Sequence, residues 1–404
     1  MYGNLIVSVS SGSIGHPVEG AKVLVTGKNT NIELITDSSG MTNKISLSTP
    51  DKQISITPSN NYAYGSYDIS VSRFGLETKR VIGVKIFPEN TSYQDVVMYD
   101  SDNKEIYENY VTLPDYYVGS YPPKIPEDPM LPLPKSRVQT DIIIPKKIVV
   151  HEGTLTNTSA ANRNINYRDY IKNVASHEIY PTWEIETLKA NIYAINSFTL
   201  NRMYTEWYRS QGYNFDITSS TMHDQAYKYS GTVFERVANV VDQVINTYLV
   251  ARNNDYPFLS QYCDGVKVAP RTYWLSQWGS QDLGLKGYSA SEIIRHYYTS
   301  AVSFATAPEE ELRESFPGYN LKIEDCGVDV QILQNQLNRI RNNFPLIPRI
   351  PTASGKFNQE TQNAVKIFQQ VFKLPQTGIV DRDTWYKISY VYVSVANIAA
   401  GLKN

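Results

Sequence analysis

The sequence is poor in charge and in cysteine, and it contains no long apolar run. Charged residues make up 19% of the 404 residues and the formal net charge is −2, which gives no bulk attraction to nucleic acid. Cys263 and Cys326 are too few for a disulfide framework or a cysteine zinc cluster, so we expect two free, partly buried thiols. No stretch of about 18 apolar residues exists that could span a membrane. Residues 1–13 lack the basic start and the apolar run of a signal peptide, and we expect none there.

The length and the apolar content predict several domains, the first of them built of strands. Hydrophobic residues make up 41% of the chain, enough for more than one core. Leu5, Val7 and Val9 recur at every second position, which is the period of a half-buried strand. Further short strands are expected at residues 21–25, 32–36, 54–58, 67–73, 81–87 and 93–99. Many short strands separated by turn residues predict a β-sandwich over residues 1–112. Residues 17–23 and 36–40 resemble the transthyretin-like or carboxypeptidase-regulatory sandwich.

Residues 113–149 are predicted to be a linker. Residues 119–135 include six prolines, and proline removes a backbone donor and fixes φ, so an extended segment is expected. An apolar stretch interrupted by Lys146 and Lys147 follows it. Val149 and Val150, at the end of that stretch, are the expected protease processing site. A surface strand is the alternative that the local features leave open.

Residues 150–318 are predicted to be an α+β domain that begins with helices. Leu188, Ile192, Ile195 and Phe198 recur at the spacing of one helical face. Pro181 precedes them and suits the first turn of a helix. The residues after this helix have mixed patterns, which indicates that strands and helices alternate there.

Residues 319–404 predict a small domain of three helices. Apolar residues form one stripe over residues 330–340 and a second over residues 364–372. Asn358 and Asp381 are the expected N-caps of the second and third helices. The order and spacing of glycines, aliphatic residues and Trp385 over residues 327–385 resemble the peptidoglycan-binding domain found on many wall hydrolases. This resemblance implies peptidoglycan as a partner, with Trp385 either packed in the core or in contact with glycan.

The middle domain resembles the stage II sporulation protein D family. Glu178 follows a turn of small residues, and Glu-Thr-Leu-Lys-Ala at residues 186–190 begins eight residues later. Two further motifs follow, Ser-Gln-Trp-Gly at residues 276–279 and Ile-Ile-Arg-His-Tyr-Tyr at residues 293–298. The resemblance implies lytic transglycosylase activity, with Glu178 as the catalytic acid and base. The local sequence alone favours a solvated residue at a helix boundary for Glu178, and the spacing to the later motifs favours the catalytic role instead.

One carboxyl group is sufficient for this chemistry. Cleavage of a glycosidic bond needs a proton on the leaving oxygen, and a hydrolase adds a second carboxylate to activate water or attack the sugar. In a lytic transglycosylase the C6 hydroxyl of muramic acid attacks within the same sugar, so one residue acts first as acid and then as base. Glu184 and Glu186 lie in the first turn of a predicted helix, where acidic residues are favoured structurally. We therefore assign neither of them a catalytic role.

The same resemblance implies a set of residues that bind the glycan. An Asp-Gln-x-Tyr element supplies Asp224, Gln225 and Tyr227, and the two later motifs supply three more candidates: Gln277, Trp278 and Tyr298. The alternative for the first element is a turn with a packed tyrosine, and for Trp278 it is core packing. The domain has one cysteine and scattered histidines, so we expect no metal and no cofactor.

The order of the domains resembles that of the clostridial spore cortex-lytic enzymes. The resemblance implies a precursor stored in the cortex or coat region of the dormant spore. It also implies that a subtilisin-like germination protease removes the N-terminal part, and that the substrate is cortex peptidoglycan with muramic lactam. Two alternatives stay open. One is a hydrolytic muramidase or glucosaminidase, and the other is a non-catalytic wall-binding spore protein.

Overall fold

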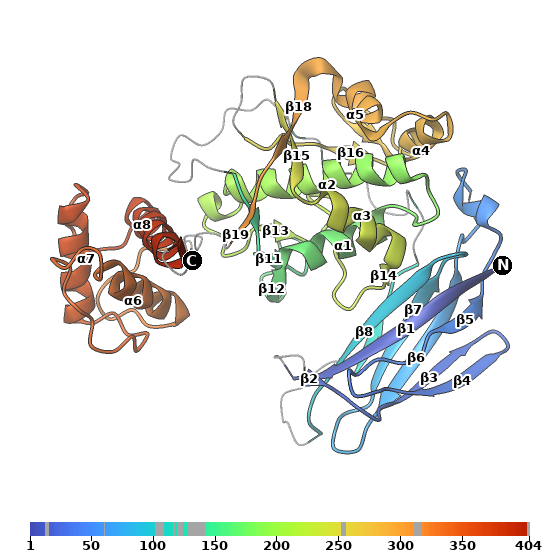
Figure 1. Ribbon diagram of the computed structural model, residues 1–404, viewed down its shortest axis with the longest axis horizontal. Helices are drawn as coiled ribbons and strands as arrows, with labels where there is room; N and C mark the ends of the chain where they lie inside the picture. Colours follow the sequence, from blue (N-terminus) through green and yellow to red (C-terminus); the bar gives the residue numbers. More distant parts are fainter. Residues whose placement is uncertain are drawn as a thin grey trace. The chain divides into compact units, whose positions relative to one another are not determined.

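The computed structural model describes residues 1–12, 16–59, 61–101, 109–115, 118, 124–125, 127, 142–251, 256–310, 317 and 319–401 (Figure 1). It divides into two compact units. The first consists of Met1–Met130, Val150–Asn201 and Ile217–Ala307, and the second of Leu131–Val149, Arg202–Asp216 and Pro308–Asn404. Most of the proline-rich residues 119–135, predicted to be extended, lie outside the described residues.

The N-terminal region is built of two five-stranded sheets around one apolar core. The first sheet has the order β14-β8-β1-β2, with β5 also paired to β1: β14 (Val233–Phe234), β8 (Thr91–Met98), β1 (Tyr2–Ser11), β2 (His16–Pro17) and β5 (Ile45–Ser48). The second has the order β4-β3-β6-β7-β9: β4 (Thr30–Ile35), β3 (Lys22–Gly27), β6 (Gly65–Ser72), β7 (Lys79–Ile86) and β9 (Tyr110–Thr112). Leu5, Val7 and Val9 are buried in this core, as their period of two predicts.

One of the predicted strands is wrong. Residues 54–58 were expected to be extended, but Lys52–Ser55 form the 3-10 helix η1. The Asp51 side chain accepts a hydrogen bond from the backbone N–H of Gln53 and caps this turn. A short polar side chain that satisfies a free N–H group favours a helical turn over a strand.

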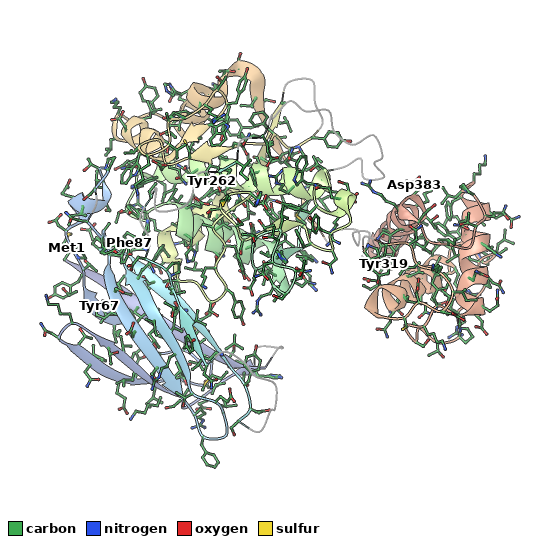
Figure 2. All side chains as sticks on the ribbon, turned by 180° about the vertical axis from the view of Figure 1, so that it is seen from behind. Met1, Tyr67, Phe87, Tyr262, Tyr319 and Asp383 are labelled. Atoms are coloured by element: carbon green, nitrogen blue, oxygen red, sulfur yellow. The ribbon has the colours of Figure 1, made fainter. Side chains whose placement is uncertain are left out.

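The sandwich and the central domain share a packed boundary within the first unit. The edge strand β14 comes from the central domain and pairs with β8 in an antiparallel register. The Phe87 ring lies 5.2 Å from the Tyr180 ring and 5.0 Å from the Phe234 ring, and Figure 2 shows Phe87 where the sandwich meets the central domain. The indole N–H of Trp183 donates to the Ser55 backbone oxygen at 2.8 Å. The sandwich therefore packs directly on the segment that follows Glu178.

The central domain combines helices with short strands, as the α+β prediction states. Its helices are α1 (Tyr167–Glu178), α2 (Ile185–Tyr204), α3 (Glu235–Val244), α4 (Gln277–Leu285) and α5 (Ala290–Tyr298), with the 3-10 turns η2 (Arg209–Gln211) and η3 (Thr299–Ala301). Its strands are β11 (Lys147–His151), β12 (Asn162–Asn166), β13 (Ile217–Thr218), β15 (Thr247–Ala251), β16 (Tyr262–Cys263), β17 (Leu275–Ser276) and β18 (Val302–Thr306). Helix α2 runs through the middle of this domain (Figure 1), and its predicted apolar face is buried. It begins at Ile185, later than the start expected near Pro181.

Val149 and Val150 lie in β11, the middle strand of the sheet β12-β11-β13. Val150 is fully buried and pairs with Ile217. The N–H of Val149 donates to the Asp216 carboxylate at 2.8 Å, and its carbonyl oxygen accepts from the Asp216 N–H at 2.9 Å. The expected boundary between residues 149 and 150 therefore falls inside a paired strand rather than in an extended linker.

The second unit contains three helices over its C-terminal residues: α6 (Val328–Ile340), α7 (Gln359–Val371) and α8 (Arg382–Gly401). Their core includes Trp385, which is 1% exposed, so the structure favours core packing for this residue. Both predicted caps are confirmed, since Asn358 accepts from the Thr361 N–H and Asp381 from the Thr384 N–H. The short pair β10 (Ile144–Pro145) and β19 (Glu309–Glu310) belongs to the same unit.

The two cysteines differ in exposure. Cys263 is buried and Cys326 is exposed, and both are free. The expectation of two partly buried thiols is therefore wrong for Cys326. Among the helices in the described ranges, none has the length and apolar character needed to cross a bilayer.

Candidate active site

Glu178 is the last residue of helix α1. The helix begins where the Asn166 side chain accepts from the Asp169 N–H, and it ends because Ile179 adopts an extended backbone. The Glu178 side chain is 7% exposed. The structure thus excludes the solvated alternative that the local sequence left open for this residue.

Three neutral donors hold the Glu178 carboxyl group. The Ala226 backbone N–H and the Tyr262 hydroxyl donate to Oε1 at 2.9 Å and 3.2 Å. The Gln277 Nε2 donates to Oε2 at 3.1 Å and also to the Glu178 backbone oxygen at 3.2 Å. Buried carboxyl oxygens need such partners, because an unsatisfied buried polar group is costly. The three donors fix the orientation of the Glu178 carboxyl group, and none of them is a second carboxyl group.

Two short parallel strands bring Tyr262 and Gln277 to Glu178. Tyr262 on β16 pairs with Leu275 on β17, and Gln277 is the first residue of α4, directly after β17. Ser276 caps α4 by accepting from the Gly279 N–H at 2.9 Å. The cap fixes where the helix begins, and so it fixes the position of the Gln277 amide.

Tyr262 is fully enclosed, and this keeps its hydroxyl group protonated. Burial, followed by the nearby charge of Glu178, raises the pKa of Tyr262 well above its ordinary value. The phenol thus stays a donor to the carboxylate throughout the physiological pH range. Sequence reasoning missed Tyr262, since its contact with Glu178 spans 84 positions of the chain and no motif contains it.

Gln225 forms hydrogen bonds with buried groups of the domain core near the site. It is fully buried. Its Oε1 accepts from the Tyr170 hydroxyl at 3.0 Å and from the Thr199 hydroxyl at 2.7 Å, and its Nε2 donates to the Ile195 backbone oxygen at 3.0 Å. Its prediction as a glycan-binding residue is therefore replaced by a positioning role, because its polar atoms bond to the core.

Asp224 and Tyr298 are also fully buried, and the structure corrects their assignment as glycan-binding residues. Asp224 Oδ2 accepts from the Thr218 N–H at 2.9 Å and from its hydroxyl at 2.7 Å, which closes a turn. The Tyr298 hydroxyl donates to the Gln261 backbone oxygen at 2.8 Å. Both residues belong to the domain core, and the motif resemblance could not distinguish a core position from a groove position.

Trp278 belongs to a cluster of packed aromatic side chains. Its ring lies 4.9 Å from the Trp183 ring and 5.8 Å from the Tyr180 ring. It is 6% exposed. The packing alternative for Trp278 therefore holds in the intact chain.

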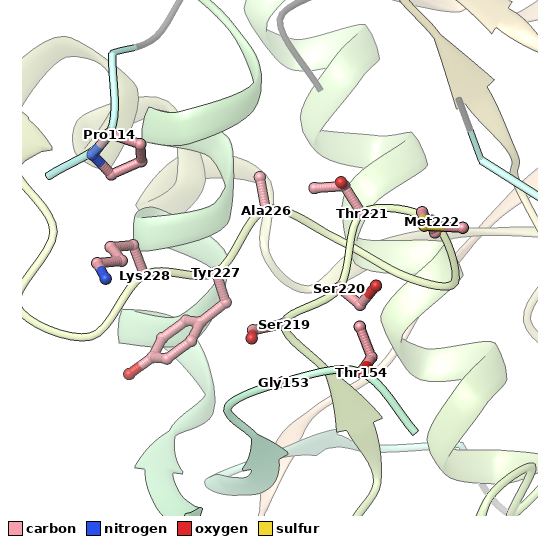
Figure 3. Close-up of a pocket in the computed structure, with 10 residues that line it drawn as sticks. All are labelled: Pro114, Gly153, Thr154, Ser219, Ser220, Thr221, Met222, Ala226, Tyr227 and Lys228. Atoms are coloured by element: carbon pink, nitrogen blue, oxygen red, sulfur yellow. The ribbon is translucent and has the colours of Figure 1, made fainter. Parts of the chain in front are cut away.

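A cavity of about 400 Å³ lies next to the loop that carries Ala226 (Figure 3). Ala226, whose N–H group holds Glu178, lines this cavity, as does the predicted residue Tyr227. The remaining lining residues are Pro114, Gly153, Thr154, Ser219, Ser220, Thr221, Met222 and Lys228. The Tyr227 ring stacks on Tyr170 at 5.4 Å, and burial raises the pKa of its hydroxyl group. Of the predicted glycan-binding residues, Tyr227 is thus the one that lines this cavity.

His177 precedes Glu178 but faces away from it. Its Nδ1 lies 2.7 Å from the Asn173 backbone oxygen, and its ring packs against Gly231. Burial lowers the pKa of His177 to about 4. The imidazole is thus neutral near pH 7 and has a structural role. Within the described residues, no group of three or more His, Cys, Asp or Glu side chains is placed to hold a metal ion.

Comparison with known families finds two domains in this chain. The family model of the Stage II sporulation protein (SpoIID) matches residues 156–251, and the model of the peptidoglycan binding domain matches residues 326–388. The chain therefore combines a SpoIID domain with a C-terminal peptidoglycan-binding domain. The first match contains Glu178, and the second contains helices α6 and α7.

Comparisons with whole proteins add little. A search of curated proteins found no match. Among solved structures, the Bacillus anthracis TIE protein aligns with a TM-score of 0.18 and 13% identity over 24% of this chain and 16% of its own. The Klebsiella pneumoniae 5-hydroxyisourate hydrolase aligns with a TM-score of 0.17 and 15% identity over 24% of this chain and 99% of its own. Transthyretin from Sparus aurata aligns with a TM-score of 0.16 and 15% identity over 26% of this chain and 90% of its own.

Proposed function

We propose that this protein is a spore cortex-lytic transglycosylase in which Glu178 is the catalytic acid and base. The observation that carries the proposal is one buried carboxyl group held by three neutral donors, one of them the N–H of Ala226, a residue that lines a cavity. The SpoIID domain supports a peptidoglycan-degrading enzyme, and the C-terminal domain would hold the enzyme on its polymeric substrate.

The proposed reaction uses the carboxyl group twice. Glu178 gives its proton to the bridging oxygen between two sugars while the bond from that oxygen to the muramic C1 breaks. The C6 hydroxyl of the same muramic residue then attacks C1 and returns its proton to Glu178. The products are a free sugar hydroxyl and a 1,6-anhydromuramic end, so no water is consumed. The Tyr262 hydroxyl can donate to the carboxylate or accept from the carboxylic acid, which suits both stages.

A hydrolytic muramidase or glucosaminidase is the alternative within the same site. That reaction requires a second carboxylate to activate water or to attack the sugar. The groups bound to the Glu178 carboxyl are a backbone amide, a phenol and a side-chain amide. These neutral groups favour lytic transglycosylation, which needs only one carboxyl group.

We further propose that the intact chain is a precursor, activated when a subtilisin-like germination protease cuts between Val149 and Val150 in the cortex or coat region of the spore. A protease binds its substrate as an extended, accessible strand. Val149 and Val150 are extended, but their strand β11 lies between β12 and β13 in its sheet. Cutting at this bond therefore requires β11 to leave the sheet, so we expect it to be slow in the isolated folded protein.

The test of Glu178 is the release of glycan from cortex peptidoglycan by the processed protein. Glu178→Gln keeps the shape of the side chain and removes the transferable proton. We expect this variant to lose cleavage and to keep binding to the wall. Glu184→Gln is the matched control, because Glu184 is exposed and lies six positions further along the chain. Cleavage retained by Glu178→Gln, or lost equally in Glu184→Gln, would remove the assignment of Glu178.

A further inference from the structure

Four described residues between the sandwich and the central domain contact the surroundings of Glu178. They are Val118, Lys124, Ile125 and Glu127, called here the anchor residues. Val118 is 6% exposed, and the Ile125 N–H donates to the Met222 backbone oxygen at 2.7 Å. The anchor residues, which contact the surroundings of the proposed catalytic carboxyl group, occupy space that a substrate would need.

The Lys124 side chain lies over two aromatic rings. Its Nζ is 4.1 Å from the centre of the Tyr262 ring and 4.3 Å from the centre of the Phe198 ring. A cation at this distance is attracted by the ring face. Lys124 therefore covers a face of the ring whose hydroxyl group donates to Glu178.

The side-chain amide of Gln261 forms two hydrogen bonds with the backbone of Glu127. Its Oε1 accepts from the Glu127 N–H at 3.0 Å, and its Nε2 donates to the Glu127 carbonyl oxygen. Gln261 is 1% exposed. A secondary amide offers one N–H and one C=O group, and the N-acetyl group of a peptidoglycan sugar is also a secondary amide. The same glutamine could therefore bind either a backbone amide or an acetamido group.

The backbone of Val118 likewise forms hydrogen bonds through both its N–H and its C=O group. The Val118 N–H donates to the Tyr180 hydroxyl at 3.1 Å, and its carbonyl oxygen accepts from the Trp278 indole N–H at 3.5 Å. Aromatic residues with a polar group at one end are well suited to sugars, since the ring packs on the sugar face while the polar group bonds to its substituents.

From these contacts we infer that the anchor residues fill a glycan subsite. Gln261 is the residue that recognises the N-acetyl group, and the faces of the Phe198 and Tyr262 rings that Lys124 covers take the sugar ring. In the intact chain Lys124 and Glu127 occupy these two positions as an intramolecular ligand. This inference rests on the proposed function only in that the ligand is an N-acetylated glycan.

A tethered ligand competes strongly with a free one. Its effective concentration is on the order of 1 mM, so a free glycan fragment loses affinity by about the ratio of this concentration to the dissociation constant of the tethered ligand. Removing the Lys124 side chain should therefore raise the apparent affinity of the subsite for a glycan fragment by about tenfold or more.

The test measures binding in full-length protein that carries Glu178→Gln, so that the fragment is not consumed. The probe is a tetrasaccharide of alternating N-acetylglucosamine and N-acetylmuramic acid. The readout is hydrogen exchange of the peptide that covers β16 (Tyr262–Cys263). We expect the tetrasaccharide to slow exchange there at about tenfold lower concentration when Lys124→Ala is added. Lys147→Ala is the control, because Lys147 is exposed. Equal concentration dependence in all three proteins would overturn the inference.

A second pair of variants tests Gln261 itself. Added to Lys124→Ala, Gln261→Leu should abolish the protection of β16 by the tetrasaccharide, whereas Gln281→Leu, a buried glutamine on α4, should preserve it. Protection that survives Gln261→Leu would refute the acetamido role. Circular dichroism of each variant checks that it is folded.

The two proposals fail in different ways. If the tetrasaccharide protects β16 in the Lys124→Ala protein and no processed protein cleaves glycan, the reaction is wrong and the subsite stands. If the processed protein cleaves glycan and Lys124→Ala leaves binding unchanged, the subsite is wrong and the reaction stands.

Discussion

Gln277 offers the sharpest test of how the Glu178 carboxyl group is held. The change Gln277→Leu keeps most of the side-chain volume and removes the amide that donates to Oε2 at 3.1 Å and to the Glu178 backbone oxygen at 3.2 Å. Both residues are at least nine-tenths buried, so water does not readily replace the lost donor. The carboxyl group should then lose both a partner and a fixed orientation.

The magnitude follows from the charge on the acceptor. A hydrogen bond to a charged group contributes about 1.5–3 kcal/mol, and 1.4 kcal/mol corresponds to a factor of about ten in rate. We therefore expect the kcat of glycan cleavage to fall by about 10- to 150-fold. KM should change little, because the amide touches the catalytic group rather than the glycan.

The assay is the rate of soluble glycan release from cortex peptidoglycan by the processed protein. Gln281→Leu is the matched control, since Gln281 lies one turn further along α4, is equally buried and accepts from the Glu184 N–H instead. A Gln277→Leu protein within twofold of the parent would refute the reasoning. So would a Gln281→Leu protein that loses as much activity.

Three further predictions concern Tyr262, His177 and Gln369. Tyr262→Phe keeps the ring and removes the hydroxyl donor to Glu178, so kcat should fall about tenfold; an unchanged kcat would contradict the orienting role. Burial lowers the pKa of His177 to about 4, so the unfolded state binds more protons than the folded state between pH 6.5 and pH 4. The free energy of unfolding should therefore fall by about 3 kcal/mol as the pH drops through this window. His177→Asn should flatten that dependence in denaturant titrations; an unaltered slope would count against it. Gln369 is fully buried and bonds to the Gly378 N–H and the Ile379 carbonyl, so Gln369→Leu should destabilise the C-terminal domain by about 2–4 kcal/mol in thermal unfolding, and an unchanged Tm would refute this.

The parts of the fold set by local chemistry were predictable from the sequence. The alternation of Leu5, Val7 and Val9 specified a strand with one buried face, and the side-chain caps at Asn358 and Asp381 specified two helix starts. In each case the signal lies within a few residues of the structure it determines. Residues 54–58 show the limit, since their apolar content favoured a strand while the Asp51 cap favoured a turn.

The candidate active site depends on contacts that no local pattern contains. Glu178 and Gln277 were identified by motif resemblance, and the structure brings them together. Tyr262 was missed, because strand pairing far along the chain places it there. Tyr298 was misassigned for the related reason that a motif does not say whether its phenol faces a groove or the core.

The most direct measurement of the central claim is isotope incorporation during cleavage. Cortex peptidoglycan is digested by the processed protein in water enriched in ¹⁸O, and the released glycans are analysed by mass spectrometry. Intramolecular attack by the C6 hydroxyl predicts anhydromuramic ends with no ¹⁸O, and none of these products with Glu178→Gln. One ¹⁸O atom at each new reducing end would contradict the account and show that the enzyme is a hydrolase.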